Sequence, residues 1–277
     1  MLLLPTVLPD TALFLDFDGT LADIAPTPDA VRVPGGLVST LAALHRQLGG
    51  ALAIVTGRPI ADIDHFLHPL QLPMAGEHGA QYRMADGSRP AIDQPPLDDA
   101  VQAMSELAAA HPGLLVERKP HSVALHYRHA PELEALCRSS MQKIVAGRAG
   151  VELLYGKCVV EVKPAGIHKG QAIAAFMSLP PFAGRVPFFA GDDVTDESGF
   201  AAVQQLGGRG IKIGEGASQA LHRCLSAAAL RGWLANARTT LGPLAESGGW
   251  DGSQAAASDS ADTGTTAAPD KIDKRIP

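Results

Sequence analysis

The chain has 277 residues, enough for one large or two smaller domains, and 46% of them are hydrophobic, which can fill a substantial core. Its net charge of −6 provides no basic surface for nucleic acid, and no stretch approaches the roughly 18 apolar residues of a membrane helix. Its three cysteines lack zinc-binding spacing, and the first residues make a poor signal peptide. We therefore expect a reduced, cytoplasmic protein with no nucleic-acid or membrane partner.

The first predicted element is a short buried strand, Ala12–Leu15, which ends at two carboxylates, Asp16 and Asp18. Ligands usually bind at this edge of a parallel sheet. Alternate residues of an extended segment point the same way, so both carboxylates can share one site, where a divalent cation would relieve their repulsion. A solvated turn is the alternative interpretation of Asp-x-Asp-Gly taken alone. A calcium loop is excluded by Leu21 and Thr27, which stand where that loop needs Gly and Glu.

Helices and strands then alternate. The predicted elements are a helix over Leu37–Leu48, a strand over Ala51–Val55, a helix from Pro59 to about Leu67 and a short strand over Pro73–Gly76. This order predicts a parallel sheet covered on both faces. The second strand ends at Thr56, whose hydroxyl is expected near the first carboxylates and can hold a phosphoryl oxygen; a helix N-cap is the alternative.

The pattern changes between about residues 80 and 163. The predicted elements are a helix over Leu97–His111, a hairpin of Leu114–Glu117 with Ser122–Tyr127, a helix over Pro131–Arg148, and a hairpin of Val151–Tyr155 with Cys158–Val162 across a Gly156-Lys157 link. Helix, hairpin, helix, hairpin is a self-contained α+β module. We interpret it as a domain inserted into the parallel pattern.

The parallel pattern resumes after the insertion. The predicted elements are a helix from His168-Lys169-Gly170 to Leu179, a strand over Val186–Ala190, a helix over about Ser198–Leu206, a strand over Gly210–Ile213 and a last helix from roughly Ser218 to Leu241. From about Glu246 the chain is rich in small and polar residues, which predicts disorder. The predicted division is a core over residues 1–79 and 165–245, an inserted domain over 80–164 and a tail over 246–277.

A second group of carboxylates follows the Val186–Ala190 strand. Asp192 and Asp193 come soon after it, and Asp196 lies one helical turn beyond Asp192. Because two strands then deliver carboxylates to one sheet edge, the sequence predicts an oxygen-rich site that suits Mg²⁺; helix capping is the alternative for this group taken alone. Lys169 stands at a helix start, which disfavours a cation, so we expect it to pair with carboxylates and phosphate rather than to be a solvated surface lysine.

These residues together resemble the four-motif signature of the haloacid dehalogenase (HAD) superfamily over roughly residues 13–214. The motifs are Asp16-Phe17-Asp18-Gly19-Thr20, Thr56-Gly57-Arg58, Lys169 at a helix start, and Gly191-Asp192-Asp193-Val194-Thr195-Asp196. The αββαββ insertion resembles the C2B cap of HAD sugar phosphatases. The resemblance thus implies an α/β fold, a Rossmann-like parallel-sheet HAD core with an inserted α+β cap.

Within that group the chain resembles the trehalose-6-phosphate phosphatases. The residues that carry this likeness are Gly76-Glu77-His78-Gly79, Glu117-x-Lys119 followed by His126-Tyr127-Arg128, and Glu161-Val162-Lys163-Pro164 before His168-Lys169-Gly170. His168 departs from the family, which often has Asn there. The resemblance implies an Mg²⁺-dependent phosphatase that hydrolyses trehalose 6-phosphate to trehalose and phosphate through an aspartyl-phosphate.

The resemblance also implies roles for the residues of the sheet edge. Asp16 would be the nucleophile and Asp18 the acid and base, while Thr56 and Lys169 would stabilise charge on the transferring group. The implied metal ligands are Asp16, the backbone carbonyl of Asp18, Asp192, and Asp196 directly or through water.

The cap would choose the substrate. Glu117, Lys119 and Glu161 would hydrogen-bond sugar hydroxyls, and Arg58 would reach phosphate or the cap. Alternating polar residues on the exposed face of a half-buried sheet are the other interpretation of the three cap positions. Three histidines without metal-like spacing, which we interpret as structural or loop residues, are His78, His121 and His126.

Other functions stay open at this point. A phosphatase for another sugar phosphate, such as sucrose-6-phosphate or mannosyl-phosphoglycerate, would share every catalytic residue. A phosphomutase would use the same nucleophile. A non-catalytic domain that binds sugar phosphate is expected to lack Asp16 or Asp18, and both are present. We expect a monomer that acts on a small molecule.

Overall fold

The computed structural model describes residues 3–91 and 95–242 of the chain. The predicted disordered tail, residues 246–277, lies outside the described residues. Within the described ranges, no helix combines the length and the apolar character that crossing a membrane requires.

The larger of two sheets has seven strands in the order β11-β10-β9-β1-β2-β3-β4. The strands are β1 (Thr11–Leu15), β2 (Leu52–Val55), β3 (Met74–Gly76), β4 (Gln81–Arg83), β9 (Val186–Gly191), β10 (Arg209–Ile213) and β11 (His222–Cys224). All pairs are parallel except β3 with β4. β1 lies in the middle, where Leu13 pairs with Leu52 on one side and Phe188 on the other. Every residue of β1 is buried, as its apolar sequence requires.

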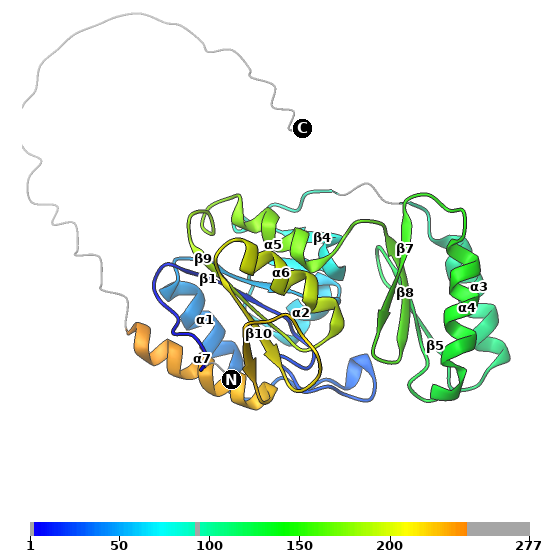
Figure 1. The fold of residues 1–277 in the computed structure, drawn as a ribbon, viewed down its shortest axis with the longest axis horizontal. Coiled ribbons are helices and arrows are strands. Elements are labelled where there is room, and N and C mark those ends of the chain that lie inside the picture. Colours follow the sequence, from blue (N-terminus) through cyan, green and yellow to red (C-terminus); the bar gives the residue numbers. More distant parts are fainter. Residues whose placement is uncertain (1–2, 92–94, 243–277) are drawn as a thin grey trace, which may run out of the picture. The chain divides into compact units, whose positions relative to one another are not determined.

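Helices cover both faces of this sheet. α1 (Leu37–Gln47) packs against α7 (Ala227–Leu241), and α5 (Lys169–Met177) packs against α6 (Glu197–Gln205) on the opposite face (Figure 1). α2 (Ile60–Phe66) follows β2. Aromatic rings join the central strand to α5, since the ring of Phe14 lies 6.1 Å from that of Phe176. The predicted parallel α/β core is confirmed.

The smaller sheet is antiparallel and has four strands in the order β5-β6-β8-β7. Its elements are α3 (Asp98–Ala110), β5 (Leu115–Arg118), β6 (Val123–His126), the 3₁₀ turn η3 (Pro131–Leu133), α4 (Glu134–Val145), β7 (Val151–Gly156) and β8 (Val159–Pro164). One face packs on α3 and α4, where Val123, Leu125, Val160 and Val162 join Met104 and Met141 in a separate apolar cluster. The predicted order of helix, hairpin, helix, hairpin is therefore present.

Strand register sets what the other face of the small sheet carries. Ala124 of β6 pairs with Glu117 of β5 and with Glu161 of β8. Side chains alternate between the two faces of a strand, so these three residues lie side by side on the face away from α3 and α4. Two of the three predicted sugar-contacting residues thus share one row of the sheet.

Three local predictions differ from the structure. The β7–β8 turn is Lys157-Cys158, not Gly156-Lys157, because Gly156 pairs with Val159 and Cys158 adopts the left-handed φ of 61°. The predicted last helix from Ser218 is wrong in its first part: residues 222–224 form β11 beside β10, and α7 begins only after Ser226, whose hydroxyl accepts a hydrogen bond from the Ala229 amide.

The third difference concerns the predicted start of the inserted domain. β4 was not predicted, and it pairs with β3 in the larger sheet although its residues follow position 80. The pairing of the larger sheet therefore extends past the proposed boundary at residues 79 and 80. The division into core and inserted domain otherwise stays a prediction.

Candidate active site

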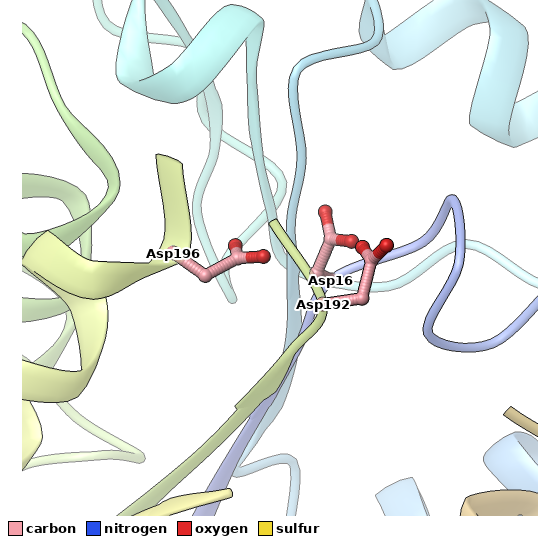
Figure 2. Close-up of side chains that lie close together, drawn as sticks. All are labelled: Asp16, Asp192 and Asp196. Carbon is pink, nitrogen blue, oxygen red and sulfur yellow. The ribbon is translucent and has the colours of Figure 1, made fainter. Parts of the chain in front are cut away.

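The carboxyl ends of β1 and β9 bring the two predicted acidic groups together. Asp16 follows β1, Asp192 follows β9, and the Asp16 amide donates to the carbonyl of Ala190, which ties the two strand ends to each other. Asp196, in the 3₁₀ turn η4 (Val194–Asp196), points its carboxylate at the other two (Figure 2). One carboxylate oxygen of each residue lies within 4.8 Å of the others. The prediction that two strands deliver carboxylates to one edge is confirmed.

Gly19 makes room for one of these carboxylates. Its φ is 75°, and a Cβ atom there would lie 2.2 Å from the Oδ2 of Asp192. A residue with a side chain could therefore not occupy this position without displacing Asp192.

Lys169 lies between two of the three carboxylates. It is the first residue of α5, and its buried Nζ donates to Asp16 Oδ1 at 2.7 Å and to Asp196 Oδ1 at 2.6 Å. The alternative of a solvated surface lysine is wrong. Asp196 also accepts from the amide of Asp193 at 2.8 Å, so the helix-capping role foreseen as an alternative exists beside the ion pair.

Two threonines complete this edge of the sheet. Thr56, at the end of β2, is buried, lines the same cavity as Asp16, and accepts the Arg58 amide at 3.2 Å. Thr20 was not singled out from the sequence, although it closes the first motif. Its hydroxyl donates to Asp16 Oδ2 at 3.1 Å, so each oxygen of that carboxylate has a donor.

The carboxylates outnumber the ammonium group beside them. Burial raises the pKa of Asp16 well above its usual range, and Asp196 and Asp192 add to this, although Lys169 opposes it. Burial, helped by the charge of Asp196, raises the pKa of Asp192 to about 7. Burial works against the charge of Lys169, but the two carboxylates it pairs with outweigh burial and raise its pKa. An oxygen-rich cluster whose three carboxylates have one ammonium group beside them fits a divalent cation.

Asp18 is turned toward a different partner. Its carboxylate forms a bidentate ion pair with Arg58, with Nε–Oδ2 at 2.6 Å and Nη2–Oδ1 at 2.8 Å. The side chain of Asp18 is not among the three clustered carboxylates, although Asp18 and Asp16 both line the cavity. The guanidinium of Arg58 also lies 5.1 Å from the ring of Phe66, which fixes its plane.

The small sheet faces the same cavity with a second set of charged groups. Lys119 Nζ donates to Glu161 Oε2 and to the carbonyl oxygen of Gly57, each at 3.0 Å. Burial disfavours the charge of Glu161, but Lys119, with His78, lowers its pKa to about 2. Glu117 Oε2 lies 2.8 Å from His126 Nε2. The predicted sugar-contacting residues are thus brought together at the cavity instead of lying on an exposed sheet face.

Both sets of residues line one cavity of about 230 Å³. It receives Asp16, Thr56 and Lys169 from the larger sheet and Glu117, Lys119 and Glu161 from the smaller one. Glu161 Oε1 is buried without a hydrogen-bond partner in the part of the chain that the structure describes. A buried acceptor of this kind needs a donor, which a ligand hydroxyl can supply.

The sequence profile of the trehalose-phosphatase family matches residues 14–223. The chain belongs to the trehalose-phosphatase family. A relative named trehalose-6-phosphate phosphatase, from Escherichia coli strain K12, is 44% identical over 233 residues, which cover 83% of this chain and 87% of the relative. The phosphoric monoester hydrolase expected from the sequence is thus confirmed at the level of the family.

Solved structures agree with this membership. A trehalose-6-phosphate phosphatase related protein superposes with a TM-score of 0.71 at 29% identity, over 82% of this chain and 97% of that one. A haloacid dehalogenase-like hydrolase from B. subtilis matches with a TM-score of 0.60 at 14% identity, over 80% and 98% of the two chains, a likeness of fold alone. The predicted HAD fold is confirmed for this trehalose-phosphatase family member.

Some contacts of this family member were not foreseen. His78 lies at the cavity, with Nε2 3.9 Å from Glu161, and Glu77 accepts hydrogen bonds from His121 and Ser122. The signal was the Gly76–Gly79 motif, which helped to establish the family resemblance but received no role. His78, His121 and His126 each contact a glutamate, and His78 and His126 line the cavity; their interpretation as structural or loop residues stays a prediction.

Proposed function

We propose that this chain hydrolyses trehalose 6-phosphate to trehalose and phosphate, as a step of trehalose biosynthesis. The observation that carries the proposal is the composition of the cavity. Asp16 and Lys169 line one side of it, and Glu117, Lys119 and Glu161 line the other. One side suits phosphoryl transfer and the other suits sugar hydroxyls. Membership of the trehalose-phosphatase family and the E. coli relative of that name support the same substrate.

Asp16 is the nucleophile in this proposal. One of its carboxylate oxygens attacks phosphorus, a bond forms between that oxygen and phosphorus, and the bond from phosphorus to the sugar oxygen breaks. Asp18, which takes up a proton when it separates from Arg58, donates that proton to the departing sugar oxygen. It then accepts a proton from the water that attacks the aspartyl-phosphate, which releases phosphate and restores Asp16.

The clustered carboxylates fit Mg²⁺, because they are buried and lack matching positive charge. Asp16, the backbone carbonyl of Asp18 and Asp192 would hold the ion, with Asp196 contributing directly or through water. When bound, it would offset the repulsion between the Asp16 carboxylate and an anionic phosphate.

Lys169 and Thr56 stabilise the transferring phosphoryl group. The Lys169 ammonium already lies 2.7 Å from the oxygen of Asp16 and is fixed by its second partner, Asp196. Phosphoryl transfer depends mostly on such positioning and charge, so a pre-oriented donor beside the nucleophile is what the reaction needs.

Arg58 holds Asp18 by two hydrogen bonds in the structure. The proposed proton transfer needs one Asp18 oxygen free, so the pair loosens when substrate enters. A phosphate oxygen can take the place of that carboxylate oxygen on the guanidinium, because phosphate and carboxylate groups both accept hydrogen bonds from it in the same geometry. This exchange reconciles the expected contact of Arg58 with phosphate and its observed contact with Asp18.

Glu117, Lys119 and Glu161 recognise the sugar. The unpaired Oε1 of Glu161 accepts from a hydroxyl, which satisfies a buried acceptor that is otherwise without a partner in the described residues. A substrate that lacks hydroxyls leaves this group unpaired and is disfavoured. Glu117 lines the same side of the cavity, and we expect Glu117→Ala to weaken turnover of a disaccharide phosphate more than that of a generic small phosphate ester.

The test is Mg²⁺-dependent phosphate release from trehalose 6-phosphate, sucrose-6-phosphate, glucose-6-phosphate, mannosyl-phosphoglycerate and p-nitrophenyl phosphate. A strong preference for trehalose 6-phosphate supports the proposal. A preference for another sugar phosphate, or broad weak activity, retains the chemistry and rejects the substrate. Conversion of glucose-6-phosphate to an isomer without phosphate release would indicate a phosphomutase.

Light scattering after size exclusion tests the expected monomer, and cell fractionation tests the expected cytoplasmic location.

A further inference from the structure

Glu77 is a buried carboxylate of the larger-sheet region to which the proposed chemistry gives no task. It opens the 3₁₀ turn η2 (Glu77–Gly79) after β3, and its side chain is 0% exposed. Its oxygens accept three hydrogen bonds from the turn between β5 and β6: from the His121 amide at 2.9 Å, from His121 Nδ1 at 3.1 Å and from the Ser122 hydroxyl at 3.1 Å. A carboxylate on one sheet region thus holds a turn of the other.

The backbone around Glu77 is held in an unusual conformation. Glu77 and His78 have φ values of 46° and 61°, in the left-handed region that residues with side chains seldom adopt. Their amides donate to the carbonyls of Arg58 and Thr56, at 3.0 and 2.9 Å. Such conformations persist where the surroundings impose them, and they gather at functional sites. The segment after β2, which carries Thr56, therefore holds the backbone of Glu77 so that its carboxylate faces the β5–β6 turn.

The turn that Glu77 holds also carries Lys119. The Lys119 amide donates to the Ser122 carbonyl at 2.9 Å, which closes residues 119–122 into one unit. One end of the unit is bound to Glu77, and at the other end Lys119 Nζ reaches the Gly57 carbonyl and Glu161. Any shift of the turn would therefore move the ammonium group that faces the cavity.

We infer that Glu77 is a positioning residue for sugar recognition: it fixes the turn 119–122 so that Lys119 and Glu161 present their polar atoms to the substrate's hydroxyls. The inference rests on the proposed function, since Lys119 and Glu161 receive their sugar contacts there. Loss of the Glu77 contacts lets Lys119 move, while Asp16 and Lys169 keep their places. The effect should therefore depend on whether the substrate carries a sugar.

The test compares Glu77→Gln with Ser122→Ala and Ser122→Thr, with trehalose 6-phosphate and p-nitrophenyl phosphate as substrates. Glu77→Gln keeps the size of the side chain but removes the charge and one acceptor oxygen. We expect kcat/KM for trehalose 6-phosphate to fall at least about tenfold, mainly through a higher KM, with that for p-nitrophenyl phosphate within about twofold of wild type. Ser122→Ala should show a smaller effect of the same kind, and Ser122→Thr should restore it because the hydroxyl is kept.

A matched control separates positioning from general stability. Asp64→Asn weakens a different half-buried ion pair, in which Arg83 Nη1 lies 2.8 Å from Asp64 Oδ2, away from the β5–β6 turn. It should lower the melting temperature and leave the ratio of the two kcat/KM values unchanged. Equal losses on both substrates in Glu77→Gln and in Ser122→Ala, or a lower melting temperature without a changed ratio, would overturn the inference. If Glu77→Gln does not fold, Ser122→Ala decides alone, because it removes one hydrogen bond.

Hydrogen exchange gives a readout that needs no substrate. The amide of His121 donates to Glu77, so exchange in peptides covering residues 119–122 should become faster in Glu77→Gln. Unchanged exchange there would overturn the positioning role even where wild-type activity supports the proposed substrate. Conversely, faster exchange together with no wild-type preference for trehalose 6-phosphate would reject the proposed substrate and, with it, the assignment to trehalose recognition.

Discussion

Two buried lysines face the same cavity, and their surroundings differ. Lys169, on the larger-sheet side, lies within 2.7 Å of Asp16 and 2.6 Å of Asp196, with the Asp192 carboxylate close by. Lys119, on the smaller-sheet side, pairs with one carboxylate, Glu161, at 3.0 Å and gives a further hydrogen bond to a backbone carbonyl. Three carboxylates therefore surround the ammonium group of Lys169, whereas Lys119 and Glu161 form a one-to-one pair.

The pKa values of the carboxylates record that difference. Burial, together with the charge of Asp196, raises the pKa of Asp192 to about 7, and the opposing effect of Lys169 is too small to prevent this. Lys119 outweighs the burial of Glu161 and lowers its pKa to about 2. An under-compensated acidic group attracts a cation and with it an anionic phosphate, whereas a balanced pair offers hydrogen bonds to neutral hydroxyls. We therefore call the side of the cavity with Lys169 the chemical side, because it suits phosphoryl transfer. The side with Lys119 is the selecting side, because it suits recognition of the sugar.

The largest expected effect comes from removing the nucleophile on the chemical side. Asp16→Asn should lower phosphate release at least about a thousandfold on every phosphate ester, because the amide lacks the carboxylate that forms the acyl phosphate. The fold should persist, since the change removes a buried charge from a cluster with too many of them. Phosphate release and thermal unfolding measure the two results. Retained phosphate release in a folded variant would disprove the role of Asp16.

The second largest effect is expected for Lys169→Met. Loss of the ammonium should lower kcat about 100-fold or more for trehalose 6-phosphate and p-nitrophenyl phosphate alike, because the charge acts on the transferring group and not on the sugar. It should also reduce stability in the absence of metal, since Asp16 and Asp196 lose a buried partner. If activity fell on trehalose 6-phosphate alone, Lys169 would act in sugar recognition, and its proposed role in phosphoryl transfer would be wrong.

Lys119→Met is the counterpart on the selecting side. It should raise KM for trehalose 6-phosphate about tenfold and leave turnover of p-nitrophenyl phosphate near that of wild type, because a small ester has no sugar to contact. Steady-state kinetics on both substrates measure the split. If Lys119→Met and Lys169→Met lowered both activities to the same extent, the division of labour between the two lysines would be wrong.

The chemical side could be predicted from the sequence in detail, and the selecting side only in part. Asp16, Asp192 and Lys169 each stand beside a strand end or a helix start, so the rules of parallel sheets bring them together. Glu117 and Glu161 share one row because of the register of β5 and β8 against β6. The alternation of polar and apolar residues shows which face a residue takes, but it does not determine which residues pair. The contact of Arg58 with Asp18 and that of Glu77 with residues 121 and 122 join segments far apart in the chain, and no local pattern encodes such pairs.

The same limit explains the errors in the elements. The last helix is predicted from roughly Ser218, but residues 222–224 form a strand. The short strand β11 is stabilised by pairing with β10, a tertiary contact that outweighs local propensity. The shift of the β7–β8 turn by one residue follows from Cys158 accepting a left-handed φ, which propensity assigns to Gly or Asn.

A thermal shift on adding Mg²⁺ tests the excess of negative charge. The pKa of Asp192 is raised to about 7, above its usual 3.8, so the metal-free protein loses stability as pH rises between these values: the unfolded chain gives up the proton first. A bound cation removes that loss. At a fixed concentration, about 100 times the Kd at pH 8, Mg²⁺ should raise the melting temperature by about 5–10 °C at pH 8 and by less at pH 5, where its Kd is higher. A larger shift at pH 5, or none at pH 8, would contradict the charge imbalance.

The smallest expected effect concerns His78, which lies between the two sides of the cavity. Burial lowers the pKa of His78 to about 3 from its usual 6.5, although Glu161 opposes this. Below pH 6.5 the unfolded chain therefore binds a proton that the folded protein does not, so the free energy of unfolding falls as pH falls toward 3. His78→Gln removes this titration and should flatten the slope between pH 6 and pH 5 by at most about 1.4 kcal/mol per pH unit.

Urea unfolding at these two pH values, with Mg²⁺ held constant, measures the slope. The exposed His65 supplies the matched control, since His65→Gln changes an imidazole that meets solvent in the folded protein as well. A slope that His78→Gln leaves unchanged would mean that the imidazole is protonated in the folded protein, as a close partner for Glu161. Glu161 would then face two cations, Lys119 and His78, and the one-to-one pairing of Lys119 with Glu161 would be wrong.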